Sequence, residues 1–246
     1  MLPIHDENPS GRTPYVTYAL IAANILVFLY QLSLSDPALK SFFYAYAVVP
    51  KELFADFGRL QGGKPVGASD FIPLLTAMFM HGGWMHLGGN MLFLYIFGDN
   101  IEERLGHGMY LLFYVIAGVI ASLAHVWSGP GSTLPSLGAS GAIGGVLGAY
   151  ILLHPKARIT TLVFLGFLIT TLRIPAMLFL GIWFAMQSLQ GLAGLASVET
   201  AGEGGTAWWA HIGGFLAGMV VGAIARTIPT PAAVARQRAD RWYSNR

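Results

Sequence analysis

Two glycine-rich apolar stretches, SGAIGGVLGAYILLH at residues 140–154 and AWWAHIGGFLAGMVVGAI at residues 207–224, decide the fold of this chain. Neither stretch contains Lys, Arg, Asp or Glu, and both place glycines three or four residues apart. Residues at that spacing share one face of a helix. A face of glycines lets two membrane helices pack backbone to backbone. We therefore predict that the two stretches are membrane helices in direct contact.

The composition of the whole chain also indicates a membrane protein. Of 246 residues, 54% are hydrophobic and only 11% are charged, whereas about a quarter of the residues are charged in ordinary soluble domains. A soluble globule of this size needs a more polar exterior. The chain has no cysteine, which excludes disulfides, thiolate zinc sites and cysteine proteases. The first apolar stretch is long enough to span, and we identify no cleavable signal peptide.

Six segments are apolar enough to cross a membrane, which predicts an all-α bundle of six transmembrane helices. The long first loop at residues 35–83 is too polar to span, so we expect an interfacial, partly helical subdomain. Residues 159–171 are apolar, short and rich in β-branched side chains, which favours an interfacial or re-entrant piece, with a seventh span as the alternative. The predicted spans are residues 16–34, 84–100, 107–127, 140–154, 174–190 and 207–224.

Basic residues are divided unevenly between the two sides of this bundle. An N-terminal tail (residues 1–14) and a basic C-terminal tail (residues 227–246) flank a transmembrane domain at residues 15–226. With six spans, both tails lie on one side of the membrane, and this side receives most of the Lys and Arg residues. The other Lys and Arg residues lie in the first loop, together with an equal number of acidic residues. Because basic residues favour the cytoplasm, both termini are predicted to be cytoplasmic.

Four polar side chains lie near the outer ends of three predicted spans. They are His86 and Asn90 on the second span, Ser140 at the start of the fourth, and His211 early in the sixth. Polar residues inside a membrane are costly and tend to mark a site. A hydroxyl nucleophile, an imidazole base and neutral hydrogen-bond donors fit acyl-transfer chemistry. These residues are therefore the candidate site.

Each of the two central residues also has a purely structural interpretation. Ser140 lies in LGASGA, where a serine that opens a helix is commonly an N-cap, although free N–H groups there also suit a developing negative charge. The imidazole of His211 can be satisfied by a neighbouring carbonyl. A functional role is favoured because Gly214 and Gly218 follow His211 by three and seven residues. His211 thus shares the glycine face that brings it to Ser140.

His86 and Asn90 are four residues apart, so both project from one helix face. Hydrogen bonding between helices is the structural alternative for them. A zinc site made of His81, His86 and His211 is a further alternative. It is disfavoured because HGGWMH lacks the glutamate of a zinc-protease helix and no carboxylate lies in the outer half of a predicted span. We expect no metal and no cofactor.

Together, the motifs resemble the three hallmark blocks of bacterial rhomboid proteases. Residues 79–106 (FMHGGWMHLGGNMLFLYIFGDNIEERLG) resemble the block H-x4-H-x3-N, residues 137–150 (LGASGAIGGVLGAY) the block G-x-S-G, and residues 208–218 (WWAHIGGFLAG) the block A-H-x-x-G. Their order, spacing and placement on the second, fourth and sixth spans match. The resemblance covers about residues 15–226. It implies a six-helix bundle of rhomboid type and an intramembrane serine endopeptidase.

The resemblance also implies roles for individual residues. Ser140 and His211 would form a catalytic dyad, and His86, Asn90 and the Ser140 N–H would form an oxyanion hole. Many family members carry a bulky aromatic residue four positions after the nucleophile, stacked on the base, and here that position is Gly144. Stacking on the base must then come from elsewhere or be absent. The supporting residues are expected to be His81, Gly138, Gly141, Gly214 and Gly218, with structural roles for Glu102 and Arg104.

The implied reaction is cleavage of peptide bonds in or near transmembrane segments of other membrane proteins. The expected partners are such substrates and the lipid bilayer, not nucleic acid, and the oligomeric state stays open. The expected location is a bacterial inner (plasma) membrane, with the site opening to the outer side. The alternatives are an inactive rhomboid-like scaffold and a channel or transporter. We further expect Gly218→Val to inactivate the protein and Gly218→Ala to be much milder.

Overall fold

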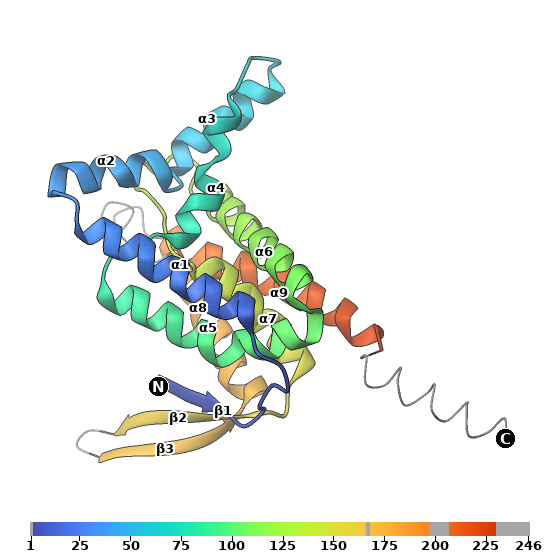
Figure 1. The fold of residues 1–246 in the computed structure, drawn as a ribbon. Helices are drawn as coiled ribbons and strands as arrows, with labels where there is room; N and C mark the ends of the chain where they lie inside the picture. The colour runs from blue at the N-terminus through green and yellow to red at the C-terminus, as the bar shows by residue number, and fades with distance from the viewer. Residues whose placement is uncertain (1, 166–167, 197–206, 230–246) are drawn as a thin grey trace.

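A computed structural model describes residues 2–165, 168–196 and 207–229 of the chain (Figure 1). Most of these residues are helical, and a small sheet lies at one end of the helices. The predicted helical membrane fold is therefore confirmed. The C-terminal tail that was predicted at residues 227–246 lies outside the described residues from position 230 onward.

Helices occupy the places of all six predicted spans. Among the described residues, four helices are long and apolar enough to cross a membrane, namely α1, α6, α8 and α9. The helix α5 has a charged C-terminal end, and α7 has only 14 residues, so a bundle of six remains compatible with this finding. The bounds are α1 (Tyr15–Leu32), α5 (Trp84–Leu105), α6 (His107–Ser128), α7 (Ser140–Leu153), α8 (Ala176–Ala196) and α9 (Trp208–Thr227).

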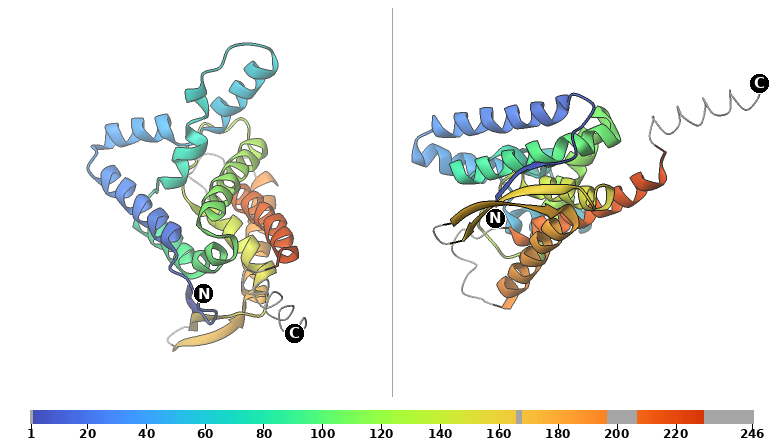
Figure 2. Two further views of the ribbon diagram at one scale, coloured as in Figure 1. Left: turned by 45° about the vertical axis from the view of Figure 1, so that its right-hand side comes forward. Right: turned by 90° about the horizontal axis from the view of Figure 1, so that it is seen from below.

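The helix α7 forms the centre of the bundle. Every residue from Gly141 to Tyr150 is buried, and α5, α6, α8 and α9 all pack against it (Figures 1 and 2). At 1.5 Å per residue its 14 residues extend about 21 Å, well short of a hydrocarbon core of about 30 Å. The helix is therefore too short to cross the hydrocarbon core by itself, and the recessed position of its first residue stays a prediction.

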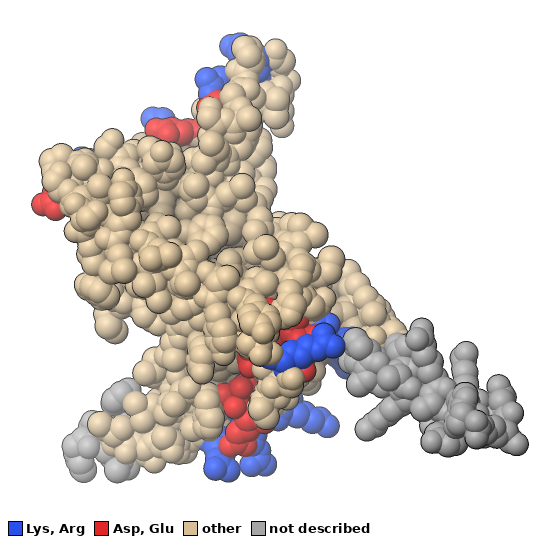
Figure 3. Space-filling model, in the orientation of Figure 1, with Lys and Arg blue, Asp and Glu red and all other residues tan. Residues whose placement is uncertain are grey.

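Charged side chains gather at two ends of the molecule, and an uncharged band separates them on the face that Figure 3 shows. The helices α2 (Asp36–Tyr46) and α3 (Pro50–Gln61) carry most of the charges of one end, and the sheet and the helix ends near it carry those of the other. Large apolar side chains point outward in between, for example Leu26 and Val220, which are 66% and 61% exposed. Such a band suits the hydrocarbon core of a bilayer.

The first loop is partly helical, as predicted. Two amphipathic helices precede a compact run of short turns, and the strand-like residue Val48 pairs with Ser136 in the loop before α7. This pairing fixes the first loop to the segment that leads into the candidate site. The elements are α2 (Asp36–Tyr46), α3 (Pro50–Gln61), η1 (Ala68–Phe71), α4 (Pro73–Thr76) and η2 (Ala77–Phe79).

The segment at residues 159–171 is a β-hairpin and not a seventh span. The strands β2 (Arg158–Leu165) and β3 (Leu168–Pro175) pair antiparallel, and β1 (Leu2–Asp6) adds to β2 on its other side. The many β-branched residues favour strands here. The sequence analysis anticipated neither this sheet nor the strand within the predicted N-terminal tail.

Two charged residues at the C-terminal end of α5 hold neighbouring helices in place. The carboxylate of Glu102 accepts hydrogen bonds from the N–H groups of Val16 and Thr17, at 2.9 and 2.8 Å, in the first turn of α1. The guanidinium of Arg104 donates to the carbonyl of Ala225 in the last turn of α9. Helix ends leave such groups unpaired. The structural roles that were expected for Glu102 and Arg104 are therefore confirmed.

Candidate active site

Ser140 and His211 meet at the N-terminal ends of α7 and α9, the two glycine-rich helices. Ser140 is the first residue of α7, and its Oγ lies 2.7 Å from Nε2 of His211 in the first turn of α9. His211 is 7% exposed, whereas Ser140 is half-buried. A hydroxyl that donates to an imidazole nitrogen at this distance is the arrangement of a nucleophile and its base.

Glycines bring these two residues together. A Cβ added at Gly214 would overlap the carbonyl oxygen of Gly141, and one added at Gly218 would overlap that of Gly145. The helices α7 and α9 are therefore in backbone contact, as the glycine pattern predicts. The same geometry revises the expectation that Gly218→Ala would be much milder than Gly218→Val, because a large effect is now predicted for alanine as well. A single methyl group already meets rigid backbone, which cannot move aside as a flexible side chain can.

Gly144 is part of the same contact and leaves no room for an aromatic residue. Its added Cβ would lie 3.0 Å from the carbonyl oxygen of His211. The ring of His211 is instead supported from α8, where Oε1 of Gln187 lies 2.6 Å from Nδ1. The indole of Trp183 faces the imidazole with ring centroids 5.9 Å apart, and Trp208 approaches it edge-on at 6.3 Å. The support that Gly144 cannot give therefore comes from α8 and from Trp208 of α9 itself.

The sequence analysis missed Gln187 and Trp183. One signal for Gln187 was present, because an amide within an otherwise apolar span is costly unless it has a partner. The identity of that partner depends on how α8 is rotated and where it crosses α9. No local pattern in the sequence fixes either property.

His86 of α5 lies against Gly138 in the loop before α7, close to Ser140. Gly138 has φ +130°, which other residues rarely adopt, and its N–H donates to the carbonyl of Ala77 at 2.8 Å. A Cβ at Gly138 would lie 2.8 Å from Cε1 and Nε2 of His86 and 3.7 Å from Oγ of Ser140. The exposed imidazole of His86 therefore lies beside the nucleophile, across a space that only glycine leaves open.

Asn90 lies one helical turn inward of His86 on α5. It is 8% exposed, and its Nδ2 has no hydrogen-bond partner within the described part of the chain. His81 is also buried, and its ring meets that of His86 edge-on at 5.0 Å. The backbone of His81 is held by Gln31, which donates to its carbonyl at 2.7 Å and accepts from its N–H at 3.1 Å. A buried amide donor without a partner is a candidate for binding an oxyanion.

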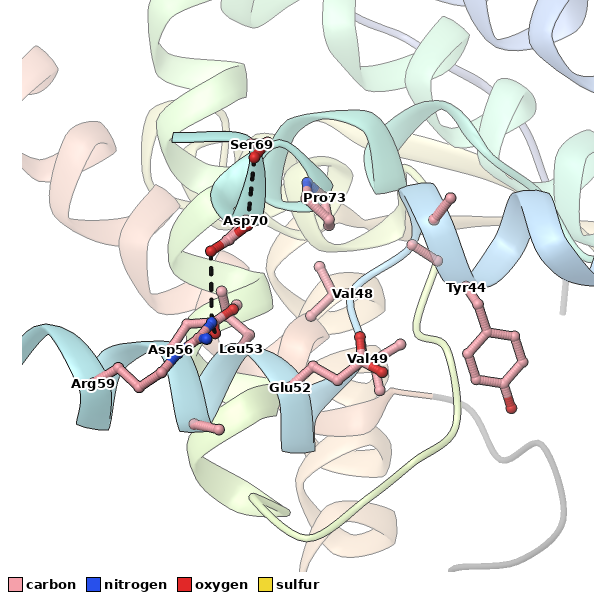
Figure 4. Close-up of a pocket in the computed structure, with 13 residues that line it drawn as sticks. Tyr44, Val48, Val49, Glu52, Leu53, Asp56, Arg59, Ser69, Asp70 and Pro73 are labelled. Atoms are coloured by element: carbon pink, nitrogen blue, oxygen red, sulfur yellow. Dashed lines mark hydrogen bonds and ion pairs between the residues drawn. The ribbon is translucent and has the colours of Figure 1, made fainter. Parts of the chain in front are cut away.

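A metal centre and a cavity in the first loop are the other places where a site could lie. Among the described residues, no group of three or more His, Asp or Glu side chains is placed to hold a metal ion. A cavity of about 550 Å³ lies in the first loop between α2, α3 and η1 (Figure 4). Its wall includes Asp70, which accepts from Ser69 and pairs with Arg59 at 3.6 Å. None of the predicted site residues lines this cavity.

Comparison with known proteins identifies relatives along most of the chain. The family model described as "Rhomboid domain" matches residues 68–228. "Rhomboid protein 1, mitochondrial" of Saccharomyces cerevisiae is 30% identical over 240 residues, which cover 93% of this chain. "Rhomboid protease GluP" of Bacillus subtilis is 29% identical over 210 residues, which cover 85% of this chain. The chain spans 58% of the yeast protein and 34% of the Bacillus protein, so it corresponds to a part of each.

Proposed function

Because the chain belongs to the rhomboid family, as the match over residues 68–228 shows, we propose that it is an intramembrane serine endopeptidase. The chain is an integral membrane protein with long apolar helices. The observation that carries the proposal is the distance of 2.7 Å between Oγ of Ser140 and Nε2 of His211. The family resemblance of the motifs gives each of these two residues a role, and their contact is the geometry that such roles require.

In the first half of the reaction, the Oγ of Ser140 attacks the carbonyl carbon of the scissile peptide bond. Nε2 of His211 takes the hydroxyl proton as the new C–O bond forms. The tetrahedral intermediate then collapses, and the imidazolium gives the proton to the departing amine. The products of this half are a free amine and an ester between the substrate's acyl group and Ser140.

In the second half, water replaces the amine. His211 takes a proton from the water as its oxygen attacks the ester carbon, and Ser140 leaves with that proton. Ser140 lies at the outer end of a short helix, below the level of a full span, so water has only a small depth to cross. A substrate helix must unwind locally before it reacts, because its carbonyl groups are otherwise hydrogen-bonded within the helix.

The negative charge of the tetrahedral intermediate needs donors on the side of Ser140 away from His211. We assign this role to the N–H of Ser140, the imidazole of His86 and the side-chain amide of Asn90. The N–H of Ser140 belongs to the first turn of a helix, where the helix itself does not use such groups. The position of His86 beside Gly138 and the unpartnered amide of Asn90 support the assignment.

The substrates that we propose are other membrane proteins, cut in or near their transmembrane segments. We further propose that both termini are cytoplasmic, that the site opens to the outer side, and that the membrane is the plasma membrane of a bacterium. The basic residues at the sheet end of the molecule, such as Lys156, Arg158 and Arg173, support the orientation. The similarity of the sequence blocks to those of bacterial members supports the choice of membrane.

An inactive scaffold of the same family is the rival that the experiment must exclude. The purified full-length protein in detergent is incubated with a fluorescein-labelled peptide that has one transmembrane segment flanked on the outer side by Ala, Gly and Ser. Wild type should release a labelled fragment, and Ser140→Ala should release none while it remains folded. Wild-type turnover by Ser140→Ala would contradict the serine mechanism, and no cleavage by either protein would favour the scaffold.

A further inference from the structure

We propose that Gln187 of α8 is a positioning residue for the base, whose side-chain carbonyl holds the proton of His211 on Nδ1. This inference rests on the proposed function, since it assigns His211 the role of base. Its structural basis is the distance of 2.6 Å between Oε1 of Gln187 and Nδ1 of His211, formed between α8 and α9. No motif that the sequence analysis singled out contains Gln187.

The two hydrogen bonds of His211 determine its tautomer. A neutral imidazole has one nitrogen that donates and one that accepts. To accept the proton of Ser140, Nε2 must carry no hydrogen, so the hydrogen of the ring must be on Nδ1. An amide oxygen accepts and cannot donate, so Oε1 of Gln187 favours this tautomer. Without an acceptor at this position, the proton is free to occupy Nε2, where it blocks the transfer from Ser140.

The surroundings of Gln187 fix its side chain in place. Gln187 is 9% exposed, and an unpartnered amide in the hydrocarbon region is costly. Trp183 lies four residues earlier on the same face of α8 and packs against the imidazole with ring centroids 5.9 Å apart. Phe184 stacks on Phe215 of α9 at 4.5 Å, one helical turn further inward than His211. These aromatic contacts position α8 so that the amide reaches Nδ1.

Gln187 performs this task without a charge. The titratable groups whose charge bears on His211 are the imidazoles of His86 on α5 and His125 on α6, and no carboxylate is among them in the described part of the chain. A neutral acceptor fixes the tautomer and the ring orientation but gives the imidazolium little charge stabilisation. A carboxylate at position 187 would add that stabilisation. Comparing Gln with Glu at this position therefore distinguishes an electrostatic role from a packing role.

The first test removes the acceptor and keeps the shape. Gln187→Met has a similar length and no amide, and Gln190→Met is the matched control, because Gln190 is exposed on the same helix. Gln187→Met should lower kcat on the model peptide by about 10-fold to 100-fold with little change in KM. The rate at which a fluorophosphonate modifies Ser140 should fall in parallel, and Gln190→Met should match wild type in both assays.

The second test replaces the amide with its isosteric acid. Gln187→Glu keeps an acceptor at the same position, so it should restore most of the activity that Gln187→Met loses. A carboxylate beside the ring also favours the imidazolium, so the acid limb of the pH profile of kcat should move to higher pH by about one unit. If Gln187 only filled space between α8 and α9, its replacement by Glu would change neither the tautomer of His211 nor the acid limb of the pH profile.

The outcomes separate this inference from the proposed function. If wild type neither cleaves the peptide nor reacts with the fluorophosphonate, the proposed function fails. If wild type does both and folded Gln187→Met is equally active, the function stands and the positioning role of Gln187 is wrong. An unchanged pH profile in an active Gln187→Glu variant would also overturn the role. A parallel loss in Gln190→Met would assign the effect to α8 as a whole.

Discussion

The helix α9 has two neighbours that bear on the site, and it meets them in different ways. It meets α7 backbone to backbone, through glycines such as Gly218 and Gly145 whose added Cβ atoms would overlap the other helix. It meets α8 through long side chains, including Trp183, Phe184 and Phe215, and α8 runs obliquely to it (Figure 2). A Cβ added at Gly191 of α8 would first meet side chains of α9, the nearest atom being Cδ1 of Ile212 at 3.2 Å.

The two contacts of α9 differ in the roles that we propose for the residues they hold. The backbone contact between α7 and α9 holds Ser140 and His211, which we expect to exchange a proton. Close packing suits this pair, because the distance between them must not vary. The contact through side chains holds Gln187, which only orients one of these groups. Side chains can shift by changing rotamer, so α8 can move relative to α9 at a lower energetic cost than α7 can. The predictions below test this division, from the largest expected effect to the smallest.

Loss of an oxyanion donor should have the largest effect, because it removes a group used in the transition state itself. His86→Ala and Asn90→Ala should each lower kcat on the model peptide by roughly 10²–10³-fold with little change in KM. Steady-state kinetics of the purified variants measure both constants. A change in KM alone would reassign these residues to substrate binding and remove α5 from the reacting part of the site.

Breaking the contact between α7 and α9 should come next. Gly218→Ala places a methyl group against the backbone of Gly145, two turns inward of the dyad, so the helices must separate. A displacement of His211 by about 1 Å should lower cleavage on the order of 10²-fold. The matched control is Gly181→Ala on α8, which has open space around it and should keep wild-type activity. Equal activity of the two folded variants would contradict the proposed division.

A change on the side-chain contact should have a smaller effect. Trp183→Leu removes the ring that faces His211 and Phe215 but leaves the amide of Gln187 and the glycine contact in place. We expect kcat to fall by about 10-fold, because the imidazole gains orientational freedom while its distance from Ser140 is kept. A loss as large as that of Gly218→Ala would show that α8 is as rigidly coupled to the dyad as α7.

Cysteine labelling should leave activity unchanged and reports the side on which the site opens. The native chain has no cysteine, so single variants are unambiguous. Thr133→Cys, in the exposed loop before α7, should react in intact cells with an impermeant maleimide, and Lys156→Cys, exposed before β2, should not. The reverse pattern would invert the proposed orientation and place the opening of the site on the cytoplasmic side.

The glycine contact could be predicted from sequence because its signal is periodic and local. Gly214 and Gly218 recur at helical spacing after His211, so the order of residues alone identifies the face that meets α7. The support of His211 by Gln187 has no such signal, since it depends on the crossing of two helices. The addition of β1 to the sheet is also non-local, because Leu2 pairs with Leu162. The large effect now expected of Gly218→Ala could not be predicted from sequence, because it depends on the distance between the backbones of α7 and α9.

The most direct test of the dyad is to identify the residue that a fluorophosphonate modifies. The purified wild-type protein is reacted with the probe in detergent, and peptide mapping by mass spectrometry locates the adduct. We predict a single adduct on Ser140 and none in His211→Ala, because Ser140 reacts only when His211 can take its proton. An adduct on another serine, or equal labelling of Ser140 in His211→Ala, would contradict the assignment of these two residues as nucleophile and base.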